Sequence, residues 1–83
     1  MKPEEDVNGN IARRIRALRL SKGIKLEDLA KAVDASPHFV TRVENGTSTL
    51  SASQLVEFSG ALGVVVSVVV GDIPANYEGK TGQ

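Results

Sequence analysis

Cysteine is absent from the 83-residue chain, and histidine occurs only once, as His38. Disulfides and thiolate metal sites are therefore excluded, and a histidine-rich metal site is not expected. The chain also lacks paired carboxylates beside a nucleophile and a glycine-rich phosphate loop after a strand, two patterns typical of enzymes. We therefore expect a protein that is not an enzyme and that uses no metal or other cofactor.

Long apolar runs are also missing. No stretch of 18 apolar residues exists, so no membrane-spanning helix is expected. The N-terminus is acidic and polar rather than basic and then apolar, so it does not look like a secretory signal. Together these absences predict a cytoplasmic protein without a membrane partner.

The chain as a whole has no excess of positive or negative charge. Ten basic residues balance ten acidic ones, which gives a net charge of zero. Eight of the cations and three of the acids lie between Ile11 and Arg42, so that segment carries +5 and the remainder −5. A domain with one basic half can bind a polyanion on that side, although a solvated helix face explains the same pattern.

The length is that of one small domain with short ends. Residues 1–10 are charged and contain a proline and a glycine, so they are expected to form a flexible arm. Residues 72–83 contain a proline and two glycines and are expected to form a tail. The domain itself is expected to span residues 11–71.

Apolar residues recur at helical spacing in four parts of this domain. The clearest helix start is at Ser36, which is a typical N-cap residue and is followed by Pro37 at the first helical position. Ser51 and Gln54 have the spacing of a capping box, and Asn10 is a plausible N-cap for the first helix. The predicted helices are 11–22, 26–33, 36–45 and 51–62.

A run of six valines around Ser67 occupies residues 64–70. The β-propensity of valine favours a strand, but a short fifth helix held by packing fits the position equally well. Periodicity cannot decide between a strand and a helix for so short an apolar run.

Two of the predicted helices form a helix-turn-helix pattern. Helices 26–33 and 36–45 are separated only by Asp34 and Ala35, and Ala30 is small where the helices must approach each other. With its valines turned inward, the second of these helices has a polar face free to enter the DNA major groove.

A resemblance to a known family supports this interpretation. The chain contains IR-LR in the first helix, L-EDLA in the second, V-T-R-V-E-N-G in the third and A-L-G-V in the fourth. These elements, in this order, resemble the Cro/repressor-type helix-turn-helix (XRE) family of bacterial and phage regulators over residues 11–71. The segments IKLEDLA and SPHFV look most like members that also carry a cupin sensor domain, which is not expected here because only about a dozen residues follow Gly71.

The resemblance implies an all-α fold, a compact five-helix lambda-repressor-like domain whose second and third helices form the helix-turn-helix. It also implies a structural ion pair between Arg19 and Glu44, and Arg42 as the strongest candidate for reading bases. One departure is Leu26, which stands where many members have a phosphate-binding glutamine. The DNA-contacting residues that the resemblance implies are Lys25, Ser36, Pro37, His38, Thr41, Arg42, Asn45, Thr47 and Ser48.

The valine run matches the short final helix of the family. One small domain cannot readily bury six valines, so we expect some of them at a homodimer interface, with simple core filling as the alternative. The expected interface residues are Val64, Val66, Val68, Val69 and Val70.

The sequence thus predicts a DNA-binding transcriptional regulator that acts as a repressor and binds double-stranded DNA at a palindromic operator as a homodimer. The alternative is a protein-interaction module, such as an antitoxin-like partner-binding protein, for which DNA binding is secondary. Zero net charge and the exposed valines motivate that alternative.

Overall fold

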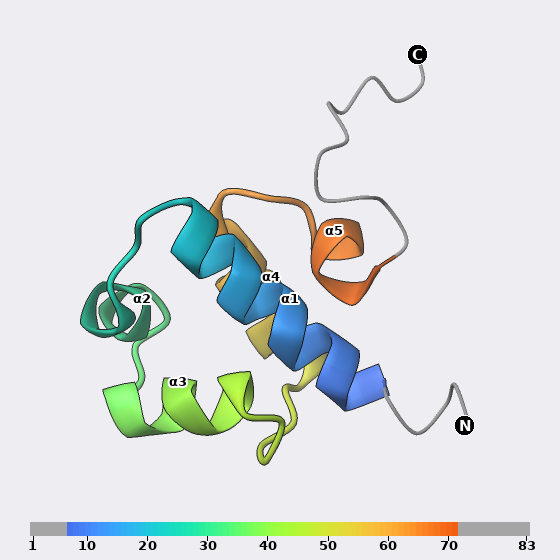
Figure 1. The fold of residues 1–83 in the computed structure, drawn as a ribbon, viewed down its shortest axis with the longest axis horizontal. Helices are drawn as coiled ribbons and strands as arrows, with labels where there is room; N and C mark the ends of the chain where they lie inside the picture. Colours follow the sequence, from blue (N-terminus) through green and yellow to red (C-terminus); the bar gives the residue numbers. More distant parts are fainter. Residues whose placement is uncertain (1–6, 72–83) are drawn as a thin grey trace.

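The computed structural model describes residues 7–71, and all regular secondary structure in this range is helical. The predicted all-α, five-helix fold is therefore confirmed, whereas the rest of the predicted arm and the tail lie outside the described residues. α1 and α4 form the centre, α2 and α3 pack together at one end, and α5 packs on α1 and α4 at the other (Figure 1). The helices are α1 (Val7–Ser21), α2 (Leu26–Ala32), α3 (Pro37–Glu44), α4 (Ala52–Leu62) and α5 (Val66–Val70).

One core joins all five helices. Phe58 and Leu62 of α4 meet Ile15 of α1 and Val69 of α5, and all four side chains are almost completely buried. No helix between residues 7 and 71 is long and apolar enough to cross a bilayer. The remaining buried apolar residues are Ala12, Leu18, Leu29, Ala30, Val33, Val40, Val43 and Val68.

The starts of α3 and α4 follow the local signals in the sequence. Ser36 Oγ accepts a hydrogen bond from the Phe39 N–H at 3.0 Å, with Pro37 at the first helical position. Ser51 and Gln54 form the complete capping box. Because each cap satisfies backbone N–H groups that the helix cannot pair itself, these starts are determined locally.

The start of α1 differs from the prediction. The helix begins at Val7, so Asn10 lies inside it and is not its N-cap, and residues 7–10 are helical rather than part of a flexible arm. Asn10 Oδ1 instead accepts a hydrogen bond from Arg13 Nη2, one turn further along the helix. Val7 lies four residues before Ile11 and continues its apolar spacing, but the intervening Asn8, Gly9 and Asn10 are poor helix formers and argued against this preceding turn.

The valine run forms the short helix α5, and the strand interpretation was wrong. Packing against α1 and α4 overrides the β-propensity of valine. Val68 and Val69, which we expected at a dimer interface, are buried in the core of the domain itself. Val64, Val66 and Val70 are half-buried.

Candidate nucleic-acid interface

α2 and α3 are joined by a turn of four residues, which contains the one non-glycine residue with a positive φ in the described range. Asp34 has φ 57°, a left-handed conformation that aspartate tolerates better than most residues. The Ala35 N–H donates to the Ala30 carbonyl at 2.9 Å and closes the turn. Ala30 is only 1% exposed, so its small side chain allows the two helices to approach each other.

Arg19 and Glu44 clamp α1 to the last turn of α3. Arg19 donates from Nε to Glu44 Oε2 at 2.6 Å and from Nη2 to Oε1 at 3.0 Å, a two-bond arrangement between guanidinium and carboxylate. A third bond runs from Arg19 Nη1 to the Ile24 carbonyl at 3.1 Å. The hydrogen bonds to Glu44 raise the pKa of Arg19 more than burial lowers it. The expected ion pair is therefore present, and it links α1, α3 and the loop before α2.

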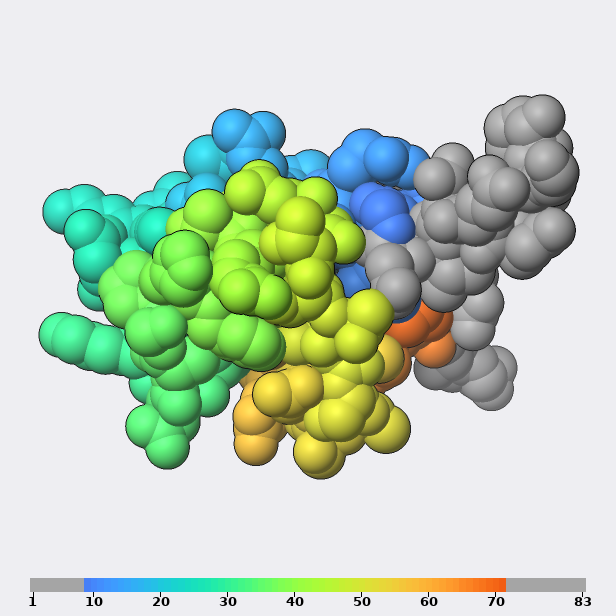
Figure 2. Space-filling model, turned by 90° about the horizontal axis from the view of Figure 1, so that it is seen from below, coloured from blue at the N-terminus to red at the C-terminus, as the bar shows by residue number. Residues whose placement is uncertain are grey.

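α3, its two cap residues and the loop that follows carry all of the predicted DNA-contacting residues except Lys25. Val40, Val43 and Glu44 face inward and are buried, so the polar positions between them point outward. Figure 2 looks onto the face formed by α3 (green) and the loop that follows it (yellow). Thr41 and Ser48 are half-buried in this region. The exposed residues there are Ser36, Pro37, His38, Arg42, Asn45 and Thr47.

The loop after α3 holds Arg42 in place. Arg42 donates from Nε to Ser48 Oγ at 3.0 Å, and the Thr47 hydroxyl donates to the Arg42 carbonyl at 3.1 Å. Neither terminal guanidinium nitrogen of Arg42 has a hydrogen-bond partner among the described residues. Two parallel donors are thus available, the arrangement that can address guanine O6 and N7 together. The sequence did not predict this hydrogen bond, because it depends on the folded path of the loop.

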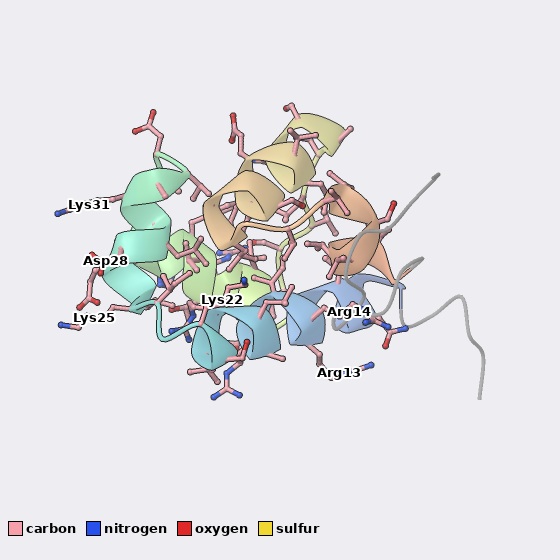
Figure 3. The ribbon with its side chains drawn as sticks, turned by 90° about the horizontal axis from the view of Figure 1, so that it is seen from above. Arg13, Arg14, Lys22, Lys25, Asp28 and Lys31 are labelled. Atoms are coloured by element: carbon pink, nitrogen blue, oxygen red, sulfur yellow. The ribbon has the colours of Figure 1, made fainter. Side chains whose placement is uncertain are left out.

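Lys25 lies apart from this cluster, at the start of α2. Its side chain is exposed and makes no cap hydrogen bond, and Figure 3 shows it pointing away from the helices. Leu26 beside it is half-buried against the core, so its side chain is occupied by packing.

Phe39 is half-buried on the inner side of α3. Its ring meets that of Phe58 of α4 edge-on, with ring centroids 6.5 Å apart. This ring contact packs α3 against α4 on the side opposite its exposed face.

α1 contributes a basic surface beside α3, and none of its residues is among the predicted DNA contacts. Arg13 and Arg16 are exposed and line a hollow together with Asn45, the residue that follows α3. The signal was present in the sequence, because both arginines lie opposite the apolar stripe of the first helix.

This fold and this exposed helix define a helix-turn-helix domain of the DNA-binding type. The sequence profile described as "Helix-turn-helix domain" matches residues 10–68. The chain belongs to this helix-turn-helix family, whose members are DNA-binding transcriptional regulators rather than enzymes.

Three solved structures illustrate the similarity. The clp gene regulator ClgR from Corynebacterium glutamicum is 29% identical, with a TM-score of 0.75 over 80% of this chain and 86% of that one. The hypothetical transcription factor NHTF from Neisseria is 27% identical, with a TM-score of 0.74 over 81% and 77% of the two chains. The restriction-modification controller protein C.AhdI from Aeromonas hydrophila is 26% identical, with a TM-score of 0.72 over 78% and 97%. No curated protein matches the sequence.

Proposed function

We propose that this regulator binds a specific palindromic operator as a homodimer and represses transcription by blocking access to an adjacent promoter. The observation that carries the proposal is Arg42, which stands on the outer face of α3 with two terminal donors available and its Nε held by Ser48. Because Ser48 already orders the Arg42 side chain, little conformational entropy is lost when Arg42 binds DNA. Its preference for guanine is therefore expected to be strong.

The base contacts are expected to come from the exposed part of α3. Arg42 and His38 offer hydrogen bonds to base edges, whereas Pro37 offers only apolar contact, for instance with a thymine methyl group. The phosphate contacts position the domain without reading sequence. They are assigned to Lys25, Ser36, Thr41, Asn45 and Thr47, whereas Ser48 is assigned to positioning Arg42 through its hydrogen bond to Nε.

The proposed dimer forms through α5. Val65, just before this helix, is 61% exposed, and Val64, Val66 and Val70 are half-buried around it. α5 lies away from α3, so pairing through α5 leaves both reading helices free (Figure 1). In a twofold dimer the two α3 helices would meet half-sites about one helical turn, roughly 34 Å, apart.

The likeness to ClgR and C.AhdI supports a regulatory role, because one is described as a gene regulator and the other as a controller protein. We propose that the protein acts in the cytoplasm, where chromosomal DNA is accessible in bacteria.

Selection from a random-sequence DNA pool tests this proposal. The purified protein is bound to the pool at moderate salt, and the retained DNA is sequenced. Enrichment of a palindrome with half-sites about one turn apart supports the dimeric operator-binding regulator. A folded protein that enriches no sequence contradicts it.

The second candidate is a protein-interaction module with secondary DNA binding. Leu20, Val56 and Val65 are all more than half exposed and offer apolar contact to a protein partner. Salt dependence separates the two candidates: DNA binding weakens steeply as salt rises, whereas an apolar protein interface responds little.

A further inference from the structure

A second basic surface lies on α1, beside the C-terminal end of α3. Arg13, Arg16, Ala17 and Leu20 follow each other at the i, i+3, i+4, i+7 spacing of a single helix face. All four line one hollow, which is completed by Glu44 and Asn45. The hollow therefore connects the side of α1 directly to the residue that begins the loop after α3.

The charge of this surface is not cancelled within the hollow. Among residues 7–71, Glu44 is the only acid that lines it, and its carboxylate is already bound by Arg19 at 2.6 Å. Arg13 donates a hydrogen bond to Asn10 Oδ1, which belongs to a neutral amide. That bond orients the Arg13 guanidinium without neutralising it, so positive charge remains at the surface.

Arg13 and its neighbour Arg14 have different surroundings. Arg14 lies against the end of α5, where a Cβ added to Gly71 would be 3.1 Å from Arg14 Nε. Arg13 projects outward from α1 in Figure 3. Arg14 is therefore part of the packing of α5, whereas Arg13 is available to a ligand.

The basic surface borders the proposed DNA-contacting face. In Figure 2 the N-terminal part of α1 (blue) comes up beside the loop after α3 (yellow). A duplex seated on α3 would pass one of its backbones along this side of the domain. Guanidinium groups suit phosphate oxygens, which they bind with paired hydrogen bonds.

We propose that Arg13 and Arg16 bind backbone phosphates that flank the base pairs contacted by α3. The DNA interface then extends from the helix-turn-helix onto α1, and these two residues add affinity without adding sequence preference. This inference rests on the proposed function, because it requires DNA on α3. An acidic protein segment could also bind two arginines, but the hollow opens beside Asn45, which favours the same DNA.

The test compares Arg13→Gln, Arg16→Gln and the double variant with the wild type. Lys31→Gln is the matched control, because Lys31 is an exposed cation that projects from α2, away from the bundle (Figure 3). Binding to the selected operator and to a scrambled duplex is measured at several salt concentrations. Thermal unfolding of each variant verifies that the fold is retained.

Each lost phosphate contact is expected to reduce the slope of log affinity against log salt by about 0.9, so the double variant should lose about 1.8. Its affinity should fall by the same factor on both duplexes, and Lys31→Gln should keep the slope of the wild type. A double variant that keeps the wild-type slope overturns the inference. A loss confined to the operator also overturns it, because the arginines would then be reading bases. A wild-type protein without salt-dependent DNA binding instead refutes the proposed function.

Discussion

Arg42 and Ser48 are joined by a hydrogen bond of 3.0 Å between the guanidinium Nε and the serine Oγ. The bond links the outer face of α3 to the loop that follows the helix. It leaves both terminal nitrogens of the guanidinium without a hydrogen-bond partner among the described residues. Ser48 is thus a positioning residue for Arg42 in the proposed interface.

Replacing Ser48 with alanine is expected to weaken the preference for the cognate base pair at the Arg42 position by roughly two- to tenfold. Without the Ser48 hydroxyl, the Arg42 side chain would lose conformational entropy when it binds DNA, which weakens its contact with the base. Ser48→Thr keeps the hydroxyl and should keep the preference. Thr49→Ala, an exposed neighbour, is the control. Competition binding with single-base variants of the operator measures the effect.

A double-mutant cycle separates positioning from direct phosphate contact. If Ser48 acts through Arg42, then Ser48→Ala has no further effect in an Arg42→Ala background. Independent, additive losses would instead assign Ser48 to a DNA contact of its own.

Arg42→Ala itself is expected to relax specificity at one base pair by about 1–3 kcal/mol. The reason is the loss of two donors to one base edge. Measurement of affinity for operators changed one position at a time shows which base pair is affected. An equal loss of affinity for every sequence would contradict base reading and make Arg42 a phosphate contact.

Glu44→Ala is expected to destabilise the fold by on the order of 3 kcal/mol, because it leaves the largely buried Arg19 guanidinium without its carboxylate. Urea denaturation followed by circular dichroism measures the loss. Glu57→Ala, an exposed acid on α4, is the comparison and should change stability by less than about 0.5 kcal/mol. Similar stabilities for the two variants would show that the clamp contributes little.

Val65→Asp is expected to weaken the proposed dimer while leaving the fold intact, because this exposed side chain would bring a charge into an apolar contact. Analytical ultracentrifugation of wild type and variant measures the shift towards monomer. Val56→Asp places the same charge on an equally exposed position of α4 and should leave the dimer unchanged. A wild-type protein that sediments as a monomer at high micromolar concentration would falsify the dimer proposal.

Much of the fold could be predicted because its signals are local. Ser36 with Pro37, and Ser51 with Gln54, mark helix starts through contacts within four residues. The short link of Asp34 and Ala35 between two predicted helices was also predicted, and aspartate tolerates the left-handed conformation found at Asp34 better than most residues.

The failures arise where distant packing decides. The valines of α5 have a strand-forming propensity that burial against α1 and α4 overrides. The early start of α1 was missed because Asn8, Gly9 and Asn10 are poor helix formers, although Val7 continues the apolar spacing of the helix. The Asn10–Arg13 hydrogen bond depends on this early start. The Arg19–Glu44 pair followed only from family resemblance, since its partners are 25 residues apart in the sequence. The structural role of this ion pair could be inferred from the matching positions of the family, whereas the hydrogen bond between Arg42 and Ser48 could not.

The buried face and the exposed face of α3 serve different functions. Val40, Val43 and Glu44 hold the helix in the bundle, whereas Pro37, His38 and Arg42 are exposed and contribute little to packing. Surface positions of this kind tolerate substitution within about 0.5 kcal/mol of stability. Exchange of these outer side chains should therefore redirect the domain to new DNA sites without refolding it, so that one scaffold can give rise to regulators with different targets.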